Sequence, residues 1–201
     1  MLTRAFQRVR RVVNSRLIKR WGDDRAKQEI WDQEFQAGEW PHLDSTADDP
    51  VYKCLEKYTN GGSIVDLGCG AGNTGNELNT RSFSEYTGVA VSQVATNLAA
   101  ARSSRNGRDK KDQYFCGDIT PFVPSGRYQV ILFRESIFYI PLSKIVDVLL
   151  RYRKHRKQNG VFIVRMFSGQ KYKSIVRLIE RNFDLIESFP QFGPDIILVF
   201  R

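Results

Sequence analysis

A short stretch in the first half of the chain carries the residues best suited to binding a ligand. The run from Ser63 to Asn73 reads SIVDLGCGAGN, in which an apolar strand ends in three glycines spaced two residues apart. Glycine lets such a turn adopt positive φ angles and brings the backbone close to a ligand. Asp66 adds a carboxylate just before the turn. The combination predicts a nucleoside-cofactor site, whereas a dinucleotide fingerprint requires a further glycine where this chain has Asn73.

An acidic residue two positions before the first glycine of a GxGxG turn resembles motif I of the class I S-adenosylmethionine-dependent methyltransferases. The resemblance implies a Rossmann-like fold and S-adenosylmethionine as cofactor. It places Asp66, Gly68, Gly70 and Gly72 against the methionine part of the cofactor, with the carboxylate binding the amino group or ordering the loop. The alternative is a glycine-rich strand-to-helix turn in an α/β domain that binds no ligand.

The segments after this turn alternate between strand and helix patterns, as a doubly wound α/β sheet requires. The short link 190–194 forces the last two strands to run antiparallel. We therefore expect a mostly parallel seven-stranded sheet that closes in a C-terminal antiparallel hairpin strand and is preceded by N-terminal helices. After a first strand around 64–67, the expected strands are 86–91, 113–119, 128–136, 160–167, 183–189 and 195–200, and the expected helices are 93–103, 141–157 and 171–182.

Ligands bind such sheets at the carboxyl ends of the strands, where two further positions bear on the cofactor. Asp118 follows the third strand, and the resemblance assigns it to the adenine amino group; a loop-capping role is the alternative. The family places an acid at the end of the second strand to accept both ribose hydroxyls, but this chain has Ala90 there. A methyl group accepts neither bond, and Ser92 or Gln93 would substitute only in part.

Ala90 leaves two functional interpretations open. Losing hydrogen bonds to a charged acceptor costs about 1.5–3 kcal/mol, or roughly ten- to a hundred-fold in affinity, so an active enzyme with weaker cofactor binding is one interpretation. A non-catalytic methyltransferase-like binding or regulatory protein is the other. The remaining cofactor motifs are intact, so we expect a methyltransferase that modifies a small-molecule or saccharide-type acceptor at oxygen or nitrogen.

Residues after the fourth strand are the candidates for contact with the acceptor. The segment 133–141 resembles the region that borders the transferred methyl group in many small-molecule methyltransferases. Glu135 suits a general base or a group that orients the acceptor, with an ion pair to Arg134 as the alternative. The expected substrate-binding residues are Arg134 and Arg165, which suit an anionic acceptor, Tyr139, which would close or stack on the pocket, and His42, for which a surface-loop position is the alternative.

The N-terminal segment differs in charge from the rest of the chain. The net charge is +9, and seven of the 31 basic residues lie in residues 1–21 without any acid, which leaves 24 basic and 22 acidic residues elsewhere. An amphipathic basic helix of this kind predicts binding to an anionic membrane surface. A mitochondrial presequence, in a eukaryote, and a helix docked on its own domain are the alternatives. The apolar stripe consists of Leu2, Phe6, Val9, Val13, Leu17 and Trp21.

Composition and spacing limit the remaining classes of function. Three cysteines, Cys54, Cys69 and Cys116, are odd in number and lack metal-ligand spacing, so we expect a cytoplasmic protein, peripheral to a membrane at most, without a metal site. The basic run 151–157 is expected at the strand edge opposite the ligand, so nucleic-acid binding is not expected. We divide the chain into a basic helix at 1–22, a helical cap at 23–60 and a Rossmann-like methyltransferase domain at 61–201.

Overall fold

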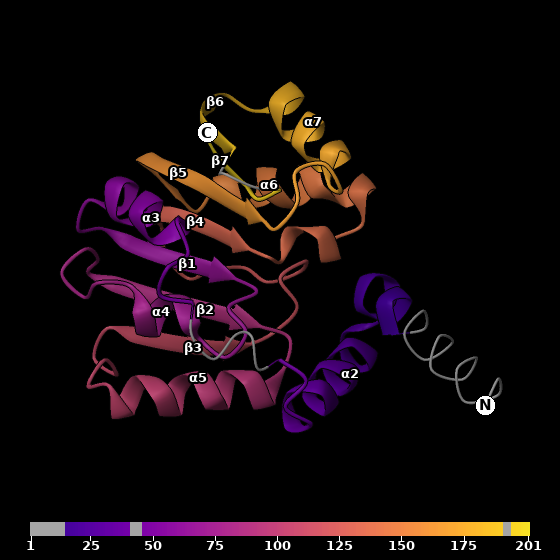
Figure 1. Ribbon diagram of the computed structural model, residues 1–201, viewed down its shortest axis with the longest axis vertical. Coiled ribbons are helices and arrows are strands. Elements are labelled where there is room, and N and C mark those ends of the chain that lie inside the picture. The colour runs from indigo at the N-terminus through magenta and orange to yellow at the C-terminus, as the bar shows by residue number, and fades with distance from the viewer. Residues whose placement is uncertain (1–14, 41–45, 191–193) are drawn as a thin grey trace.

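Seven strands form a single sheet in the computed structural model, which describes residues 15–40, 46–190 and 194–201. Their order is β3-β2-β1-β4-β5-β7-β6 (Figure 1). Strand β7 runs antiparallel to both of its neighbours, and the other neighbouring pairs are parallel. The predicted fold class is therefore confirmed. The strands are β1 Ser63–Leu67, β2 Glu85–Ala90, β3 Asp112–Cys116, β4 Tyr128–Arg134, β5 Arg156–Met166, β6 Leu185–Pro190 and β7 Ile196–Phe200.

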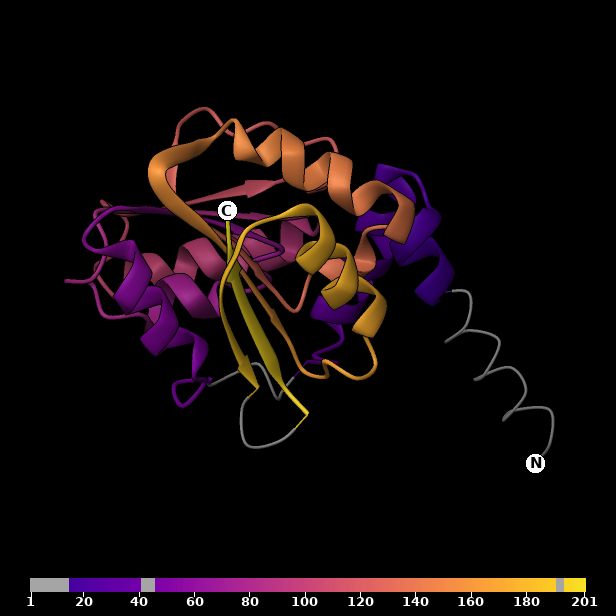
Figure 2. The same cartoon turned by 90° about the horizontal axis from the view of Figure 1, so that it is seen from above.

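Helices cover both faces of the sheet because the central strands are apolar on both sides. Along β1, Ile64 packs with α3 (Val51–Thr59) on one face, and Val65 packs with α6 (Ile145–Arg153) and α7 (Lys173–Asn182) on the other. Figure 2 shows α6 and α7 on the same side of the strands. The helix α5 (Gln93–Arg105) packs against β2 and β3, and the short α4 (Asn73–Glu77) directly follows the glycine turn.

The helix α2 (Asp24–Gln36) lies beyond the carboxyl ends of the strands, to the right of the strand arrowheads in Figure 1. It begins after Asp23, whose side chain caps the helix by accepting a hydrogen bond from the Ala26 amide at 2.8 Å. It ends at Ala37, and Gly38 takes a positive φ of 64°. Within the cap segment, α2 thus lies over the edge at which ligands bind in this class of sheet, whereas α3 packs on a face of the sheet.

The predicted helix 141–157 and strand 160–167 are wrong at their shared boundary. The helix α6 ends at Arg153, and β5 begins at Arg156, so the last residues of the basic run enter the sheet. The reason is pairing with β4: the Tyr128 amide donates to the His155 carbonyl at 2.8 Å, and Tyr128 lies opposite Arg156. This strand contact outweighs the helical preference of a lysine- and arginine-rich segment.

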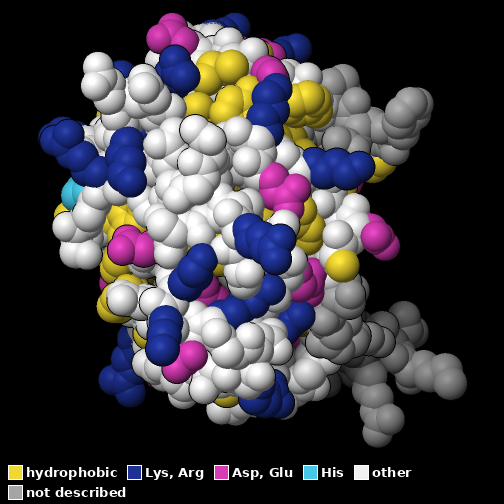
Figure 3. All heavy atoms as spheres, turned by 90° about the vertical axis from the view of Figure 1, so that its left-hand side faces the viewer, with side chains coloured by type: hydrophobic (Ala, Val, Ile, Leu, Met, Phe, Trp, Pro, Cys, Tyr) yellow, Lys and Arg dark blue, Asp and Glu magenta, His cyan; other side chains and the backbone are white. Residues whose placement is uncertain are grey.

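The opposite edge of the sheet, where the parallel strands begin, carries part of the basic run. Arg156 donates to three nearby carbonyl oxygens, at 2.7 to 3.2 Å, so its guanidinium group is engaged by the neighbouring backbone. On this face Lys and Arg side chains lie scattered among neutral and acidic ones (Figure 3). Within the described residues, this arrangement does not form one continuous basic field.

Only the end of the predicted N-terminal stripe falls within the described residues. Residues 15–21 are helical, and the apolar side chains of Leu17 and Trp21 are 54% and 62% exposed. Lys19, by contrast, is buried over the ring of Trp31 at 3.8 Å. Leu2, Phe6, Val9 and Val13 lie outside the described residues. Among the described helices, none is long and apolar enough to cross a membrane, and no group of potential metal ligands occurs in the same part of the chain.

Candidate functional site

The three glycines after β1 have different roles. All take positive φ angles, of 95° at Gly68, 54° at Gly70 and 78° at Gly72. A Cβ atom at Gly68 would lie 2.3 Å from the Cβ of Ser136, and one at Gly72 would lie 2.6 Å from a side chain of α5. At Gly70 the nearest atom is a Phe35 ring carbon at 3.7 Å. Close packing therefore requires the outer two glycines, and among the three only Gly70 has room for a Cβ atom, which would contact Phe35 of α2.

Asp66 lies behind the glycine turn rather than at its surface. Its side chain is buried, and its Oδ2 atom accepts a hydrogen bond from the Tyr86 hydroxyl at 2.6 Å. Burial raises the pKa of this carboxyl group. Its Oδ1 atom is buried without a hydrogen-bond partner among the described residues. An unsatisfied buried acceptor is costly, and the side chain of Thr74, the second residue of α4, opposes the rise in the pKa of Asp66.

Asp118 is held by the protein itself. One oxygen accepts a hydrogen bond from the Thr120 amide at 2.7 Å, and the other pairs with the ammonium group of Lys27 on α2. Burial alone would raise the pKa of Asp118, but the hydrogen bonds from Lys27 and Thr120 outweigh it and lower the pKa below its ordinary value. The structure therefore contains the loop-capping contact and adds an ion pair that the sequence did not reveal.

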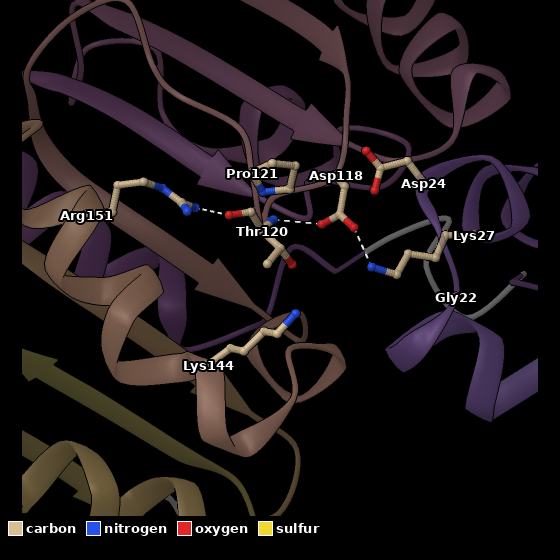
Figure 4. A pocket seen from close by; sticks show the side chains of 8 residues that line it. All are labelled: Gly22, Asp24, Lys27, Asp118, Thr120, Pro121, Lys144 and Arg151. Carbon is tan, nitrogen blue, oxygen red and sulfur yellow. Dashed lines mark hydrogen bonds and ion pairs between the residues drawn. The ribbon is translucent and has the colours of Figure 1, made fainter.

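A hollow of about 380 Å³ opens beside this ion pair (Figure 4). Lys27 and Asp118 point toward each other across it, and Lys144 extends toward it from the start of α6. Arg151 also lines the hollow and donates to the Thr120 carbonyl. The expectation that the whole run 151–157 faces away from the ligand edge is thus wrong for Arg151, because its long side chain reaches back along α6. The lining residues are Gly22, Asp24, Lys27, Asp118, Thr120, Pro121, Lys144 and Arg151.

At the end of β2, the carboxylate of Asp32 approaches from α2. Ala90 is buried and pairs in register with Cys116 of β3. Ser92 is already engaged: its hydroxyl caps α5 by accepting from the Ala95 amide at 3.0 Å and donates to Asp32 at 2.6 Å. The same Asp32 oxygen accepts from the backbone amide of residue 94 at 3.1 Å. Burial raises the pKa of the Cys116 thiol, and the nearby charge of Asp32 adds to that rise.

The helix α2 therefore crosses three strand ends in order. Lys27 meets the end of β3, Asp32 the end of β2, and Phe35 the turn after β1. Eight residues of helix span about 12 Å, and three neighbouring strands span about 10 Å, so the dimensions agree. Trp31 also packs edge-to-face on Tyr139, after β4, at 5.2 Å. Sequence reasoning missed these contacts, although the spacing of 27, 31 and 35 by four residues signals one face of a helix.

The ends of β4 and β5 hold two neighbouring arginines. Arg134 and Arg165 lie opposite each other in register. Between them, Asp49 approaches the Arg134 guanidinium at 2.8 Å and the Arg165 Nε atom at 3.4 Å, and Asp195 accepts from Arg165 at 2.8 Å. Both arginines are thus neutralised internally. The predicted contact with an anionic acceptor is replaced in this structure by Asp49, which sequence reasoning did not single out.

Glu135 adopts an unusual backbone conformation at the end of β4. Its φ angle is 55°, in the region that non-glycine residues rarely adopt, and such strain concentrates at functional sites. Its Oε1 atom pairs with Arg165, so the anticipated pairing with Arg134 is wrong. Its Oε2 atom is buried without a hydrogen-bond partner among the described residues. Burial raises the pKa of this carboxyl group, although Arg165 opposes that rise. His42, the remaining candidate, lies outside the described residues.

Comparison with known proteins agrees with this architecture. A family model described as a methyltransferase domain matches residues 64–160, which run from β1 into β5. No curated protein matches the chain in sequence.

Several solved structures share the fold at low sequence identity. A methyltransferase from Clostridium acetobutylicum has a TM-score of 0.64 at 16% identity, over 86% of this chain and 96% of its own. The N-methyltransferase NodS from Bradyrhizobium japonicum gives 0.64 at 14%, over 81% and 90%. A 1,6-didemethyltoxoflavin-N1-methyltransferase from Burkholderia thailandensis gives 0.69 at 14%, over 87% and 86%. The matched model identifies residues 64–160 as a methyltransferase domain, and the glycine turn and strand order give the chain the Rossmann-like fold of the class I methyltransferases.

Proposed function

We propose that this protein transfers a methyl group from S-adenosylmethionine to the amine nitrogen of a small molecule. The observation that carries the choice of acceptor is Glu135, whose Oε2 atom has no partner in the described structure. Together with Asp49 and Asp195 it makes three carboxylates beside the two guanidinium groups of Arg134 and Arg165. Because carboxylates outnumber guanidinium groups here, this end of the sheet favours a neutral or cationic acceptor over an anionic one.

The residues at the carboxyl ends of β1, β2 and β3 fit the cofactor. Gly70 has no side chain, so its backbone could face the cofactor once the Phe35 ring moves aside, and the unpaired oxygen of Asp66 suits a donor such as an ammonium group. Asp118 stands two strands away and suits a donor on a base. When bound, S-adenosylmethionine supplies an electrophilic methyl carbon on a sulfonium centre. The glycine turn and α2 would hold the reactive end of the site and exclude water.

Glu135 would accept the proton that the acceptor loses. The nitrogen lone pair forms a bond to the methyl carbon as the carbon–sulfur bond breaks, and that bond's electron pair stays on sulfur. The proton on nitrogen then passes to Oε2 of Glu135. A carboxyl group whose pKa is raised is a better base than an ordinary one, and positioning supplies the remainder of the rate.

The solved structures support nitrogen as the acceptor atom. Two of the three described above are named as N-methyltransferases, and a glycopeptide N-methyltransferase with the same fold has a TM-score of 0.66 at 14% identity. Transfer to a hydroxyl of a saccharide or another small molecule is the competing assignment, because a carboxylate base also serves an alcohol.

A panel of acceptors tests the proposal. The protein is incubated with S-adenosylmethionine carrying a labelled methyl group and with matched amines, alcohols, saccharides and carboxylic acids, and the labelled products are identified by mass spectrometry. We expect transfer to amines, a strong decrease in turnover for Glu135→Gln with cofactor affinity retained, and no change for Glu29→Gln, an exposed control on α2. Labelled alcohols without labelled amines would refute the choice of nitrogen.

A protein without turnover is the second candidate function, and the position of α2 favours it. Phe35 covers the open face of Gly70, and Lys27 occupies Asp118. If the side chains of Phe35 and Lys27 keep these positions, the glycine turn and Asp118 are closed to the cofactor. Thermal unfolding with and without S-adenosylmethionine separates the candidates, because a ligand of the native state raises the midpoint by mass action. An unchanged midpoint at millimolar ligand would favour the protein without turnover.

We further propose that residues 1–21 hold the protein at an anionic membrane surface, in a cytoplasmic setting. The exposure of Leu17 and Trp21, next to a basic segment, supports this. Co-sedimentation of the full chain with vesicles should be strong with anionic lipid, weak with neutral lipid, and reduced by salt. Replacing Leu17 and Trp21 with serine should reduce it. The control Val123→Ser, also exposed and apolar, should not.

A further inference from the structure

A ligand that spans the cofactor half of the edge must cross the end of β2. The glycine turn follows β1 and Asp118 follows β3, and β2 lies between these strands. The distance across two strand spacings is about 10 Å, which is the reach of a nucleoside with a short side chain. The middle of such a ligand, its ribose, therefore lies over the end of β2.

The end of β2 offers no side-chain acceptor of its own. Ala90 ends the strand, and the nearby Ser92 hydroxyl is engaged on both sides, as acceptor from Ala95 and donor to Asp32. A bound ribose buries two hydroxyl groups, which require acceptors because unpaired buried donors are costly. In sheets of this kind, a carboxylate about twenty residues beyond the glycines normally meets this requirement.

Asp32 brings a carboxylate to this place from α2. Its Oδ1 atom is fixed at 2.6 Å from the Ser92 hydroxyl and 3.1 Å from the Val94 amide. These two bonds come from the segment that directly follows Ala90. Its Oδ2 atom makes no hydrogen bond to another residue in the described part of the chain, so acceptor capacity remains. These two hydrogen bonds place the carboxylate beside the end of β2, and its charge also acts on Cys116, the register partner of Ala90.

We propose that Asp32 takes the place of the missing strand carboxylate and accepts hydrogen bonds from the ribose hydroxyls of S-adenosylmethionine. This inference rests on the proposed cofactor. It assigns the ribose contact to the N-terminal cap rather than to the sheet. Cofactor binding then holds α2 against the edge, because one side chain contacts both the sugar and the start of α5.

Calorimetric titration with S-adenosylhomocysteine, the demethylated cofactor, tests the assignment without turnover. We expect Asp32→Asn to weaken binding by roughly ten- to a hundred-fold, since an amide oxygen keeps the contacts to Ser92 and the Val94 amide but lacks the charge. Glu29→Gln removes a carboxylate from an exposed position on the same helix and should bind like the parent. Circular dichroism and thermal unfolding establish that both variants fold.

A ligand without the hydroxyls separates a ribose contact from a purely structural one. The parent should bind the 2′,3′-dideoxy form of S-adenosylhomocysteine more weakly than the natural compound. The Asp32→Asn variant should bind both forms with nearly the same affinity. If Asp32 only stabilises α5, the variant loses equal affinity for both ligands, and that result would overturn the inference.

Moving the carboxylate back to the strand gives an independent test. Ala90→Asp in the parent places a second carboxylate beside Asp32 and should not tighten binding, because the two charges repel. Ala90→Asp in the Asp32→Asn background should recover most of the lost affinity. No recovery in a folded double variant would count against the assignment. A parent that binds no S-adenosylhomocysteine at all would refute the proposed cofactor itself, whereas equal binding by parent and Asp32→Asn would refute only the role of Asp32.

Discussion

The two halves of the ligand edge are built in different ways. At the ends of β1, β2 and β3, backbone packing shapes the surface through Gly68 and Gly72, and single side chains of α2 reach each strand end separately. At the ends of β4 and β5, two arginines and three carboxylates form one network of ion pairs. The first half depends on close backbone packing, and the loss of one charge there affects a single contact. In the second half, the removal of one arginine leaves a buried carboxylate without its nearest cation.

The largest effect should come from the charge network. Arg134→Met leaves Asp49, whose side chain is only 8% exposed, with the more distant Arg165 as its cation. Breaking a buried pair from one side costs about 3–5 kcal/mol. Urea unfolding should show this loss. The control Arg25→Met breaks an exposed pair, 90% and 59% exposed, and should leave the midpoint unchanged. Equal urea midpoints for the two variants would mean that the buried network stabilises the fold no more than an exposed ion pair does.

The second-largest effect should be a difference in stability between substitutions at two glycines of the turn. Gly68→Ala places a Cβ atom 2.3 Å from Ser136 at a φ of 95°, so strain and overpacking together should cost roughly 2–5 kcal/mol of unfolding free energy. Gly70→Ala meets only Phe35 at 3.7 Å and should cost about 1–2 kcal/mol from its backbone angle.

Gly70 should nevertheless be the position that matters for the ligand. Gly70→Val should fold and should lose S-adenosylhomocysteine binding in calorimetry, because its side chain would fill the open face under α2. A folded Gly70→Val variant that binds normally would move the cofactor away from this turn.

The third effect concerns the link between Lys27 and Asp118. Lys27→Met removes a charged partner from a buried carboxylate and should cost about 1.5–3 kcal/mol at neutral pH. Because the folded-state pKa of Asp118 is lowered, its contribution is complete above the unfolded pKa of about 3.9 and is lost as the pH falls through the folded value. Stability measured from pH 7 to pH 2 should therefore converge for parent and variant in acid. A constant difference would assign the effect to packing.

The smallest expected effect is a gain in stability rather than a loss, at Glu135. The folded-state pKa of Glu135 is raised, so its ionised form destabilises the fold above the unfolded pKa of about 4.3, and this cost disappears as the pH falls. Glu135→Gln should raise the unfolding midpoint at pH 8 by about 1–3 °C, and the gain should vanish near pH 4. A lower unfolding midpoint for the variant at pH 8 would mean that the ion pair of Glu135 with Arg165 stabilises the fold by more than the burial of the carboxylate costs.

Local patterns in the chain predicted the sheet and the turn, but not what covers them. The run around Asp66 specifies a strand and glycine turn through neighbouring residues, and the α2 cap at Asp23 follows from its immediate sequence. The contacts of Lys27 with Asp118, Asp32 with Ser92 and Arg134 with Asp49 join residues 91, 60 and 85 positions apart. Residue spacing contains no record of such pairs, so an anionic acceptor was expected at arginines that the protein neutralises itself.

By itself, the sequence determined the fold class, the place of the glycine turn and the absence of a carboxylate at Ala90, because strand period, helix period and glycine conformation act over a few residues. The tertiary structure alone decided that α2 crosses three strand ends, that Glu135 pairs with Arg165 and that β5 begins at Arg156. These outcomes depend on packing and strand pairing between distant segments. Packing selects a partner by three-dimensional proximity, and only the folded chain defines that proximity.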